Sequence, residues 1–356
     1  MTTSPPTVGV AAAREARATV LGLVEARIRG LITEERARWA AVDVRAGSLV
    51  DAVGGLVEAG GKRLRPTFCV SGFLAAGGRQ EDPGIVGPAA ALELLHVLAL
   101  IHDDVLDDSA LRRGVPTAHV RHAAEHEARG WHGESRRFGE GIAILAGDLA
   151  HVYANRLAAE APDPARKIWA ELSIEMCVGQ FLDIVIAAEC DTDPRLASWI
   201  AVSKSGRYTI QRPLLLGATI AGRPELAGPF GDYGLALGEA FQLRDDLIDA
   251  FGDGAVTGKP VGLDFAQQKV TLLIALAMQR DERVRAIVSA GPDNAAGWDA
   301  VALRAALTDS GVRADVERRI DRLVDRACVA ITRAPLDDAW RSELADMASR
   351  VAYRDR

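Results

Sequence analysis

Lysine is scarce in this sequence: only five of its 42 basic residues are lysine, and the others are arginine. Aromatic residues make up 5% of the chain, and no run of alternating β-branched residues indicates a strand. The net charge of −7 argues against a broad nucleic-acid-binding surface. With 49% hydrophobic and 26% charged residues among 356, the composition is typical of a globular protein and excludes a disordered chain or a collagen.

Cysteine is also rare, and the four cysteines form no Cys-x-x-Cys pair. This spacing excludes a disulfide scaffold and favours reduced thiols in a cytoplasmic protein. The N-terminal segment has neither the basic start nor the apolar core of a signal peptide. The longest apolar stretch, from Ile85 to Ile101, is interrupted by Pro88, Glu93 and His96. It therefore predicts a buried helix rather than a transmembrane segment.

The residues that dominate the chain, alanine, leucine and arginine, are good helix formers. Long segments with apolar periodicity alternate with short breaks rich in glycine and proline, which predict roughly ten to thirteen helices. Residues 1–10 are predicted to be disordered. Because no linker or fixed-period repeat divides the remainder, residues 11–356 are expected to form one large all-α domain.

Two acidic clusters lie within apolar helical segments. In the first, which spans residues 103–108, Asp103 and Asp107 are one helical turn apart and share a face. Carboxylates that face one another in a water-poor groove repel unless a cation neutralises them. Oxygen ligands of this kind suit Mg²⁺, which takes one or two carboxylates and shares its coordination shell with phosphate oxygens.

The second cluster repeats this pattern roughly 140 residues later. Asp245 and Asp249 are again one turn apart, and Gln242 precedes them on the same face. Anionic side chains are unfavourable near a helix C-terminus, so an incidental run of charge explains such clusters poorly. The two clusters together predict facing walls of one metal-filled cavity.

Basic residues near these clusters complete the pattern. The segment GGKRLRP at residues 60–66 predicts a loop that enters a helix N-terminus, an anion-binding geometry that Lys62 and Arg65 reinforce. Arg112 and Arg113 follow the first acidic cluster, and each can bind a different anion because adjacent side chains diverge. Four of the five lysines lie in such segments: Lys62, Lys204, Lys259 and Lys269. The pattern indicates two diphosphate sites, one bridged by metal and one held by basic side chains alone.

The motifs GGKRLRP, HDDVLDDSALRRG, FQLRDDLID and GKPVGLD together resemble the trans-type polyprenyl diphosphate synthases, from about residue 50 to the C-terminus. GQFLD and KSGRYTIQRP are similar to actinobacterial short-chain members such as geranylgeranyl diphosphate synthase. The resemblance implies an all-α fold of the isoprenoid synthase type with a central cavity, and a homodimer. It also implies a prenyltransferase that condenses isopentenyl diphosphate head-to-tail with an allylic diphosphate (dimethylallyl, geranyl or farnesyl). The implied cofactor is Mg²⁺, with three ions when substrate is bound.

The same resemblance assigns roles to individual positions. The implied metal ligands are Asp103, Asp107, Asp245 and Asp249, supported by Asp104 and Asp246. The allylic diphosphate would contact Arg112, Lys204, Ser205, Gln242, Lys259 and Lys269, and Ser205 with Gln242 would stabilise the allylic cation. Isopentenyl diphosphate would contact Lys62, Arg65, His96 and Arg113. The residues expected to carry catalysis are Asp103, Asp107, Arg112, Lys204, Gln242, Asp245 and Lys259.

Product length in this family depends on the positions four and five residues before the first aspartate, here Ala99 and Leu98. Leu98 stands where related short-chain enzymes often have phenylalanine, so a deeper cavity is expected. Leu94, Leu95 and Ala91 are predicted to form its floor. The expected product is geranylgeranyl diphosphate, then a longer prenyl diphosphate, then farnesyl diphosphate.

Residues 119–137 form an insertion that holds four of the seven histidines: His119, His122, His126 and His132. Their spacing could gather a metal ion on one helix face, but no cysteine or supporting partner is evident. A solvated, partly helical insertion is therefore the preferred interpretation. The actinobacterial resemblance also accounts for it.

Two other functions stay open at this point. A class I terpene cyclase on the same scaffold would bind metal and an allylic diphosphate, but it would have no use for the basic residues Lys62, Arg65, His96 and Arg113. A non-catalytic partner subunit of a prenyl synthase would not require both acidic clusters to be complete. An α-helical protein with incidental charge would have to place six aspartates in apolar helices by chance.

Overall fold

The structure is a computed structural model that describes residues 9–112, 114–189, 193–252, 262–290 and 297–354. In chain order, the described elements are α1 (Val10–Ala40), α2 (Val44–Glu58), α3 (Leu64–Ala75), η1 (Pro83–Ile85), α4 (Val86–Leu106), β1 (Leu111–Arg112), β2 (Val115–Pro116), α5 (Ala118–Ala128), α6 (Ser135–Ala158), α7 (Asp163–Glu189), α8 (Pro194–Ile200), η2 (Ala201–Gln211), α9 (Arg212–Ile220), η3 (Pro224–Leu226), α10 (Ala227–Phe251), α12 (Leu263–Ala266), α13 (Leu272–Met278), α14 (Glu282–Ser289), α15 (Ala300–Asp309), α16 (Val312–Thr332) and α17 (Asp338–Ala352).

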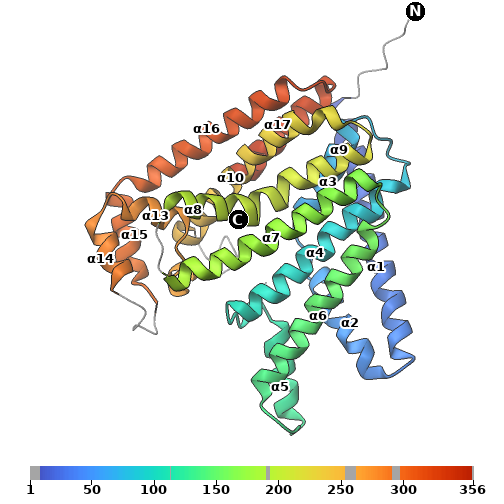
Figure 1. Cartoon of the computed structure of the whole chain (residues 1–356), viewed down its shortest axis with the longest axis horizontal. Helices are drawn as coiled ribbons and strands as arrows, with labels where there is room; N and C mark the ends of the chain where they lie inside the picture. The colour runs from blue at the N-terminus through green and yellow to red at the C-terminus, as the bar shows by residue number, and fades with distance from the viewer. Residues whose placement is uncertain (1–8, 113, 190–192, 253–261, 291–296, 355–356) are drawn as a thin grey trace, which may run out of the picture.

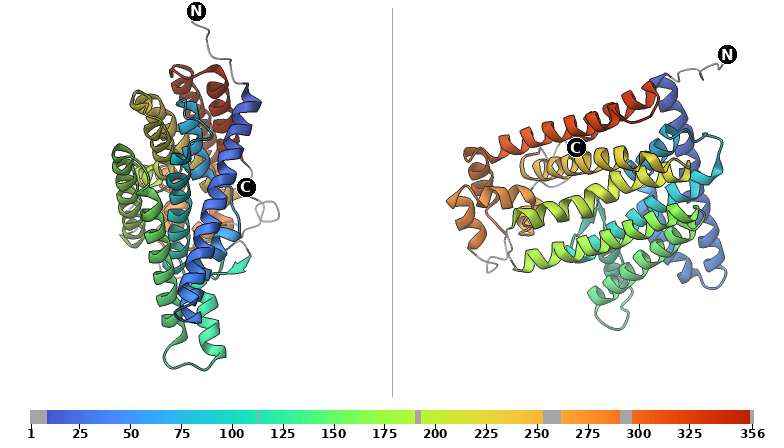
Figure 2. Two further views of the ribbon diagram at one scale, coloured as in Figure 1. Left: turned by 90° about the vertical axis from the view of Figure 1, so that its right-hand side faces the viewer. Right: turned by 45° about the horizontal axis from the view of Figure 1, so that its top comes forward.

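The long helices form a bundle in which α4, α7, α10 and α16 cross the molecule in similar directions (Figure 1). The helix α4 packs against α6, and α10 packs against α16 and η2. The short helices α13, α14 and α15 gather at one end, and α1 runs along one edge of the bundle (Figure 2). The first acidic cluster lies at the end of α4, and the second lies near the end of α10.

The prediction of an all-α fold is confirmed, because the described strands are limited to the two-residue antiparallel pair β1 and β2. The sequence underestimated the number of helices. Four short helices between Leu263 and Asp309 account for most of the difference, since segments of four to ten residues give little periodicity. Residues 1–8 of the predicted disordered segment lie outside the described residues, whereas Val10 already begins α1.

The apolar helix α4 is more continuous than the sequence indicated. Pro83–Leu106 is long and apolar enough to cross a membrane, and it is the one such helix among the described residues. However, 72% of its most apolar 18-residue stretch is buried within the protein. Leu92, Leu94 and Leu95 are fully buried, so the helix is part of the hydrophobic core, as predicted.

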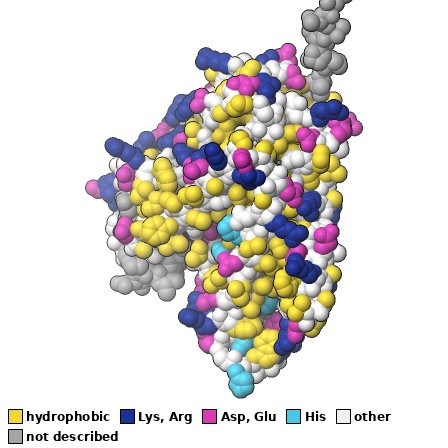
Figure 3. Space-filling view, turned by 45° about the vertical axis from the view of Figure 1, so that its right-hand side comes forward, with side chains coloured by type: hydrophobic (Ala, Val, Ile, Leu, Met, Phe, Trp, Pro, Cys, Tyr) yellow, Lys and Arg dark blue, Asp and Glu magenta, His cyan; other side chains and the backbone are white. Residues whose placement is uncertain are grey.

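The prediction of a solvated insertion at residues 119–137 is wrong for three of its histidines. His119, His122 and His126 are buried, because α5 packs along α6. The ring of His126 also contacts those of Trp131 and Phe138 in a small aromatic cluster. Histidine side chains are visible near the lower tip of the molecule, where α5 and α6 are joined (Figure 3).

Two glycines let η2 and α10 approach each other at backbone distance. A Cβ atom added to Gly238 would lie 2.4 Å from Cα of Gly206, and one added to Gly206 would lie 2.8 Å from Cα of Gly238. Any side chain at either position would therefore push the two helices apart. This contact matters for function because Lys204 lies on η2, and Gln242 and Asp246 lie on α10.

We expect Gly238→Ala to lower the free energy of unfolding by about 1–3 kcal/mol, because the added methyl group overpacks a backbone contact. Urea unfolding monitored by circular dichroism would measure the loss. The control is Gly228→Ala on the same helix, where no atom lies within 4 Å of an added Cβ. Equal stability of the two variants would show that the close approach does not constrain the fold.

Candidate active site

A cavity of about 430 Å³ lies beside the first acidic cluster, and residues of α3, α4, α6, α7 and η2 contribute to its lining. Its polar lining residues include Arg65, His96, Asp103, Gln180 and Lys204, and its less polar ones include Leu98, Ala99, Met176 and Cys177. The cavity therefore joins groups suited to anions and a space suited to an apolar chain.

In the first acidic cluster, two aspartates are paired with cations. Arg112 donates from Nε to Oδ1 of Asp104 at 2.7 Å, and its Nη2 forms an ion pair with the same oxygen at 2.5 Å. Lys269 donates from Nζ to Oδ2 of Asp107 at 2.9 Å. Asp103 lines the large cavity. Burial raises the pKa of Asp103, and the nearby charge of Lys204 opposes that rise.

In the second cluster, Gln242 donates from Nε2 to Oδ1 of the buried Asp246 at 2.8 Å. Both side chains line a second, smaller cavity of about 130 Å³ together with Lys204 and Lys269. Since Lys204 lines both cavities and Lys269 reaches Asp107, these two lysines lie between the acidic clusters.

The other two aspartates of this cluster point to different partners. Asp249 accepts hydrogen bonds from the backbone N–H groups of Leu263 and Asp264, at 3.1 and 3.0 Å. Asp245 forms an ion pair with Arg354, which follows α17. Neither aspartate is among the described lining residues of the two cavities, although both were predicted as metal ligands.

Lys204 is held in place by an aspartate that the sequence analysis did not assign. Its Nζ donates to Oδ2 of Asp183 on α7 at 2.7 Å. The segment η2 that carries Lys204 is a π-helix, a form that is rare and often found at functional sites. Within it, Lys204 and Tyr208 both reach the large cavity.

The carboxyl groups of the site have too little positive charge around them for their degree of burial. Burial is the main cause that raises the pKa of Asp103, Asp104, Asp246, Asp249 and Asp264. Asp264 is the clearest case, because burial and the neighbouring Asp249 raise its pKa to about 7. A divalent cation would relieve these charges, so the donor set fits Mg²⁺.

The described residues include no group of three or more acidic, histidine or cysteine side chains close enough to hold a metal ion alone. This arrangement suits Mg²⁺ shared with a diphosphate, because that ion commonly takes one or two carboxylates and fills the rest of its shell with phosphate oxygens and water. It does not suit a closed structural metal site with protein ligands only.

The four residues predicted for isopentenyl diphosphate are separated. Arg65 and His96 line the large cavity, where the Arg65 guanidinium lies 4.2 Å from the ring centroid of Tyr208. Lys62 instead lines a different cavity, near α17. Arg113 lies outside the described residues, as do Lys259 and the side chain of Ser205.

The residues predicted to set product length are partly placed as expected. Leu98 and Ala99 both line the large cavity. Leu94 and Leu95 were predicted to form its floor, but they are fully buried and are not among its described lining residues, and the same holds for Ala91. The apolar space is bounded instead by α7, through Met176 and Cys177.

The sequence analysis missed four residues that the fold brings to the site: Gln180, Asp183, Tyr208 and Asp264. All four lie within motifs already recognised, in GQFLD, KSGRYTIQRP and GKPVGLD. Their charge or hydrogen-bonding groups were a usable signal. Arg354 reaches the site from the C-terminal segment, where it pairs with Asp245.

Comparison with known proteins identifies the family. Residues 47–301 match the family described as Polyprenyl synthetase. The chain belongs to this family. Relatives include the geranylfarnesyl diphosphate synthase of Aeropyrum pernix, 32% identical over 82% of this chain and 89% of that protein. Another is heptaprenyl diphosphate synthase component 2 of Geobacillus stearothermophilus, 33% identical over 88% of this chain and 92% of that protein.

Among solved structures, the geranylgeranyl pyrophosphate synthase of Corynebacterium glutamicum, complexed with isoprenyl diphosphate and magnesium, is similar to this chain. It superimposes with a TM-score of 0.86 at 34% identity, covering 94% of this chain and 98% of that one. Members of the polyprenyl synthetase family transfer prenyl groups, so this protein is an enzyme of the prenyl transferase class. Its relatives differ in the length of the product that their names state.

We predict that Asp183 and Lys204 act as a unit in this polyprenyl synthetase. In a double-mutant cycle of Asp183→Asn and Lys204→Met, kcat/KM should reveal a coupling free energy of about 1–3 kcal/mol, because the pair is a short charge-assisted hydrogen bond. Asp163→Asn, an exposed position on the same helix, should combine additively with Lys204→Met. Additivity of the Asp183 cycle would contradict the predicted role.

Proposed function

We propose that this enzyme condenses isopentenyl diphosphate with an allylic diphosphate to give a trans-polyprenyl diphosphate. The observation that carries the proposal is the shared cavity of about 430 Å³. Of the residues that line it, we infer that Arg65 and His96 bind one diphosphate, and that Lys204 binds the other together with Mg²⁺ held by Asp103. A terpene cyclase, which binds a single diphosphate, would have no use for the first pair.

We propose Mg²⁺ as the cofactor, held by Asp103 and Asp107 on one wall and by the second acidic cluster on the other. When bound, the metal would neutralise the charge of the departing diphosphate. Asp245 is proposed as a ligand only after it separates from Arg354, with which it is paired here. Three ions with substrate bound are our expectation, and the raised pKa values of the buried aspartates support cation binding.

The proposed reaction begins when the C–O bond of the allylic diphosphate breaks and its electron pair leaves with the diphosphate. Arg112, Lys204 and Lys269, together with Lys259, would bind that leaving group in a site that excludes water. Ser205 and Gln242 would stabilise the allylic cation. The double bond of isopentenyl diphosphate then supplies the electron pair for the new C–C bond, and a proton passes to the released diphosphate.

We propose geranylgeranyl diphosphate as the main product, with a longer prenyl diphosphate as the second candidate. The similarity to the Corynebacterium geranylgeranyl pyrophosphate synthase supports this length. The cavity below Asp103 supports it as well, because Leu98 and Ala99 leave space that an aromatic side chain would fill.

We also propose a homodimer that works in the cytoplasm. Exposed apolar side chains on α6 and α7 support self-association, because such residues are unusual on a surface that faces water. They are Ile144, Leu145, Val152, Ile174, Val178, Phe181 and Ile184.

The first experiment is to incubate the protein with Mg²⁺, isopentenyl diphosphate and, separately, dimethylallyl, geranyl and farnesyl diphosphate. We expect elongation to a linear prenyl diphosphate, with no turnover after the metal is removed with EDTA. Asp103→Asn should abolish elongation while the protein stays folded, because the variant removes a metal ligand from a desolvated position. Asp108→Asn is the control, since this neighbouring carboxylate is exposed.

Each other outcome would overturn the proposal in a distinct way. Release of diphosphate with a hydrocarbon product and no elongation would indicate a terpene cyclase. No turnover with any allylic substrate would indicate a subunit that needs a different partner chain. Full activity of Asp103→Asn would exclude the proposed metal site.

We predict that Leu98→Phe shortens the main product, because the larger ring blocks the space into which the chain grows. Ala99→Phe should shorten it further, since Ala99 is one residue closer to Asp103. Chromatography of the dephosphorylated products would measure both. If neither variant changes the product, length is controlled from α7 rather than from α4.

A further inference from the structure

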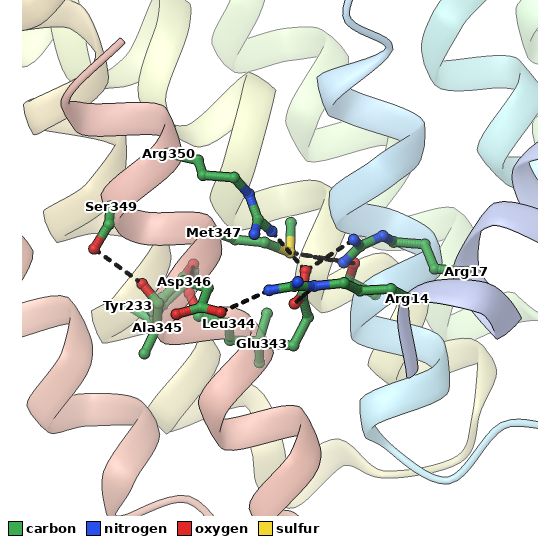
Figure 4. A network of polar contacts seen from close by, with 11 residues as sticks. Arg14, Arg17, Tyr233, Glu343, Leu344, Ala345, Asp346, Met347, Ser349 and Arg350 are labelled. Atoms are coloured by element: carbon green, nitrogen blue, oxygen red, sulfur yellow. Dashed lines mark hydrogen bonds and ion pairs between the residues drawn. The ribbon is translucent and has the colours of Figure 1, made fainter. Parts of the chain in front are cut away.

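Two buried ionisable side chains outside the reaction site differ in how well their contacts explain them. Glu343 is fully buried, and Arg14, Arg17 and Arg350 point toward it from α1 and α17 (Figure 4). These ion pairs account for its burial, because they neutralise its charge and join the two helices. His119, at the start of α5, is also buried, but its Nε2 has no hydrogen-bond partner among the described residues. A buried polar ring of this kind needs a different explanation.

The contacts of His119 lead to the segment of chain that follows α4. Nδ1 of its ring lies 3.2 Å from Oγ1 of Thr117, which is buried as well. The Thr117 hydroxyl in turn donates to the carbonyl oxygen of Ser109 at 2.8 Å. The backbone N–H of Thr117 donates to the carbonyl oxygen of Ala110 at 3.1 Å. The segment 107–112 is therefore held at two consecutive residues from the start of α5.

Hydrogen-bond chemistry determines how the His119 ring takes part. A backbone carbonyl only accepts, so the single hydroxyl proton of Thr117 is used in the bond to Ser109. The Thr117 oxygen then accepts from His119, and Nδ1 is the donor. Nε2 lies 4.0 Å from Oδ1 of Asp108, which is too far for a hydrogen bond. The ring therefore acts through Nδ1–H, a group that both its neutral and its protonated form can carry.

The hydroxyl of Thr117 is used in an unusual way for its position. Thr117 is the N-cap residue of α5, where a threonine side chain commonly accepts a hydrogen bond from the first turn of its own helix. Among the described residues it makes no such capping bond, and it donates to Ser109 instead. The helix α5 thus gives up a stabilising contact of its own in order to hold the segment 107–112.

The helix α6 makes the start of α5 a rigid support. The carbonyl oxygen of His119 lies so close to Gly139 of α6 that a Cβ atom added to this glycine would collide with it. The helix α6 also packs along α4, which carries the first acidic cluster. Because closely packed helices do not shift freely, the ring of His119 has a fixed position relative to that cluster.

The segment 107–112 carries two groups of the reaction site. Asp107, at one end, is a proposed metal ligand, and Arg112, at the other end, is proposed to bind the allylic diphosphate. Between them, Asp108 has a left-handed backbone with a φ of 48°, which is unfavourable for a residue with a Cβ atom. A strained segment keeps its shape only where its surroundings hold it.

We propose that His119 and Thr117 are positioning residues for the reaction. They hold the segment 107–112 so that Asp107 faces the metal and Arg112 faces the allylic diphosphate. His119 does not touch the substrate: it donates to Thr117, and Thr117 donates to Ser109. This inference rests on the proposed function, because it concerns the metal and the allylic substrate proposed above.

Kinetics with substituted histidines test the proposal. His119→Leu removes the donor, whereas His119→Asn keeps an N–H group on the atom attached to Cγ. In His119→Leu, the KM for the allylic diphosphate and the Mg²⁺ concentration for half-maximal activity should each rise about tenfold, because one buried hydrogen bond is lost. His119→Asn should bring both back to within about threefold of the wild-type values. A loss of folded protein would lower kcat and leave both of these quantities unchanged.

The matched control is His122→Leu. This histidine is also buried and lies one turn further along α5, but it pairs with Glu125. His122→Leu should leave the KM for the allylic diphosphate and the Mg²⁺ requirement within about threefold of the wild-type values.

A second measurement needs neither metal nor substrate. Amide hydrogen exchange, followed by mass spectrometry, reports on backbone bonds such as the one from Ser109 N–H to the Asp104 carbonyl oxygen, at 2.9 Å. Exchange across residues 107–112 should be about tenfold faster in His119→Leu than in the wild type, and unchanged in His119→Asn. If His119→Leu does not fold, Thr117→Val tests the same link, because it replaces the hydroxyl with a methyl group of similar size.

The possible outcomes separate this proposal from the proposed function. Unchanged exchange and unchanged kinetic constants in His119→Leu would overturn it. Equal effects of His119→Leu and His122→Leu would also overturn it, because both histidines would then only pack α5 against α6. Failure of His119→Asn to restore the wild-type values would exclude the role of Nδ1–H. Absence of elongation by the wild-type protein would contradict the proposed function, and the exchange measurement would still decide whether His119 holds the segment.

Discussion

The structure depends on how buried carboxylates on α4 and α10 are balanced by positive charge. Removing these groups from water raises the pKa of Asp103, Asp246 and Asp249, and mutual repulsion makes their ionised forms more costly. The basic side chains of the site supply part of the positive charge that these carboxylates need. Lys269 reaches Asp107, Arg112 reaches Asp104, and Arg354 reaches Asp245. The contacts of Lys269 and Arg354 also hold together parts of the chain that are distant in sequence.

The same pairs indicate how the site could change when substrate arrives. Each of these basic side chains has one carboxylate partner here. A metal ion bound to that carboxylate would replace the basic side chain, which could then contact a phosphate oxygen. Binding of metal and of diphosphate would then be linked, because the metal takes over the carboxylate and the diphosphate takes over the basic side chain. Lys204 is paired with Asp183 in the same way and could also turn to a phosphate oxygen. The scarcity of lysine elsewhere in the chain agrees with a specific use of its compact charge at this site.

The sequence predicted the helical class, the two acidic clusters and the cavity beside Asp103, because these features depend on local periodicity and on charge placed in apolar segments. It did not predict that Lys62 and Arg65 would line different cavities. The residue between them that changes the backbone direction is Arg63, which has a left-handed conformation. It also misjudged the histidines of α5, because a polar helix can be buried when a neighbour such as α6 covers it. The contact of Arg354 with Asp245 joins residues 109 positions apart, beyond the reach of local patterns.

The π-helix η2 has a consequence for how this chain can vary in length. A π-helix has more residues in each turn than an α-helix. The segment η2 also joins α8 and α9 without a loop. Deleting one residue between Ala201 and Gln211 would change the register of this helix relative to α7 and α10. Lys204 and Gly206 could then not both keep their partners on α7 and α10. Insertions and deletions should therefore be tolerated around this segment, in the connections before α8 and after α9, but not within it.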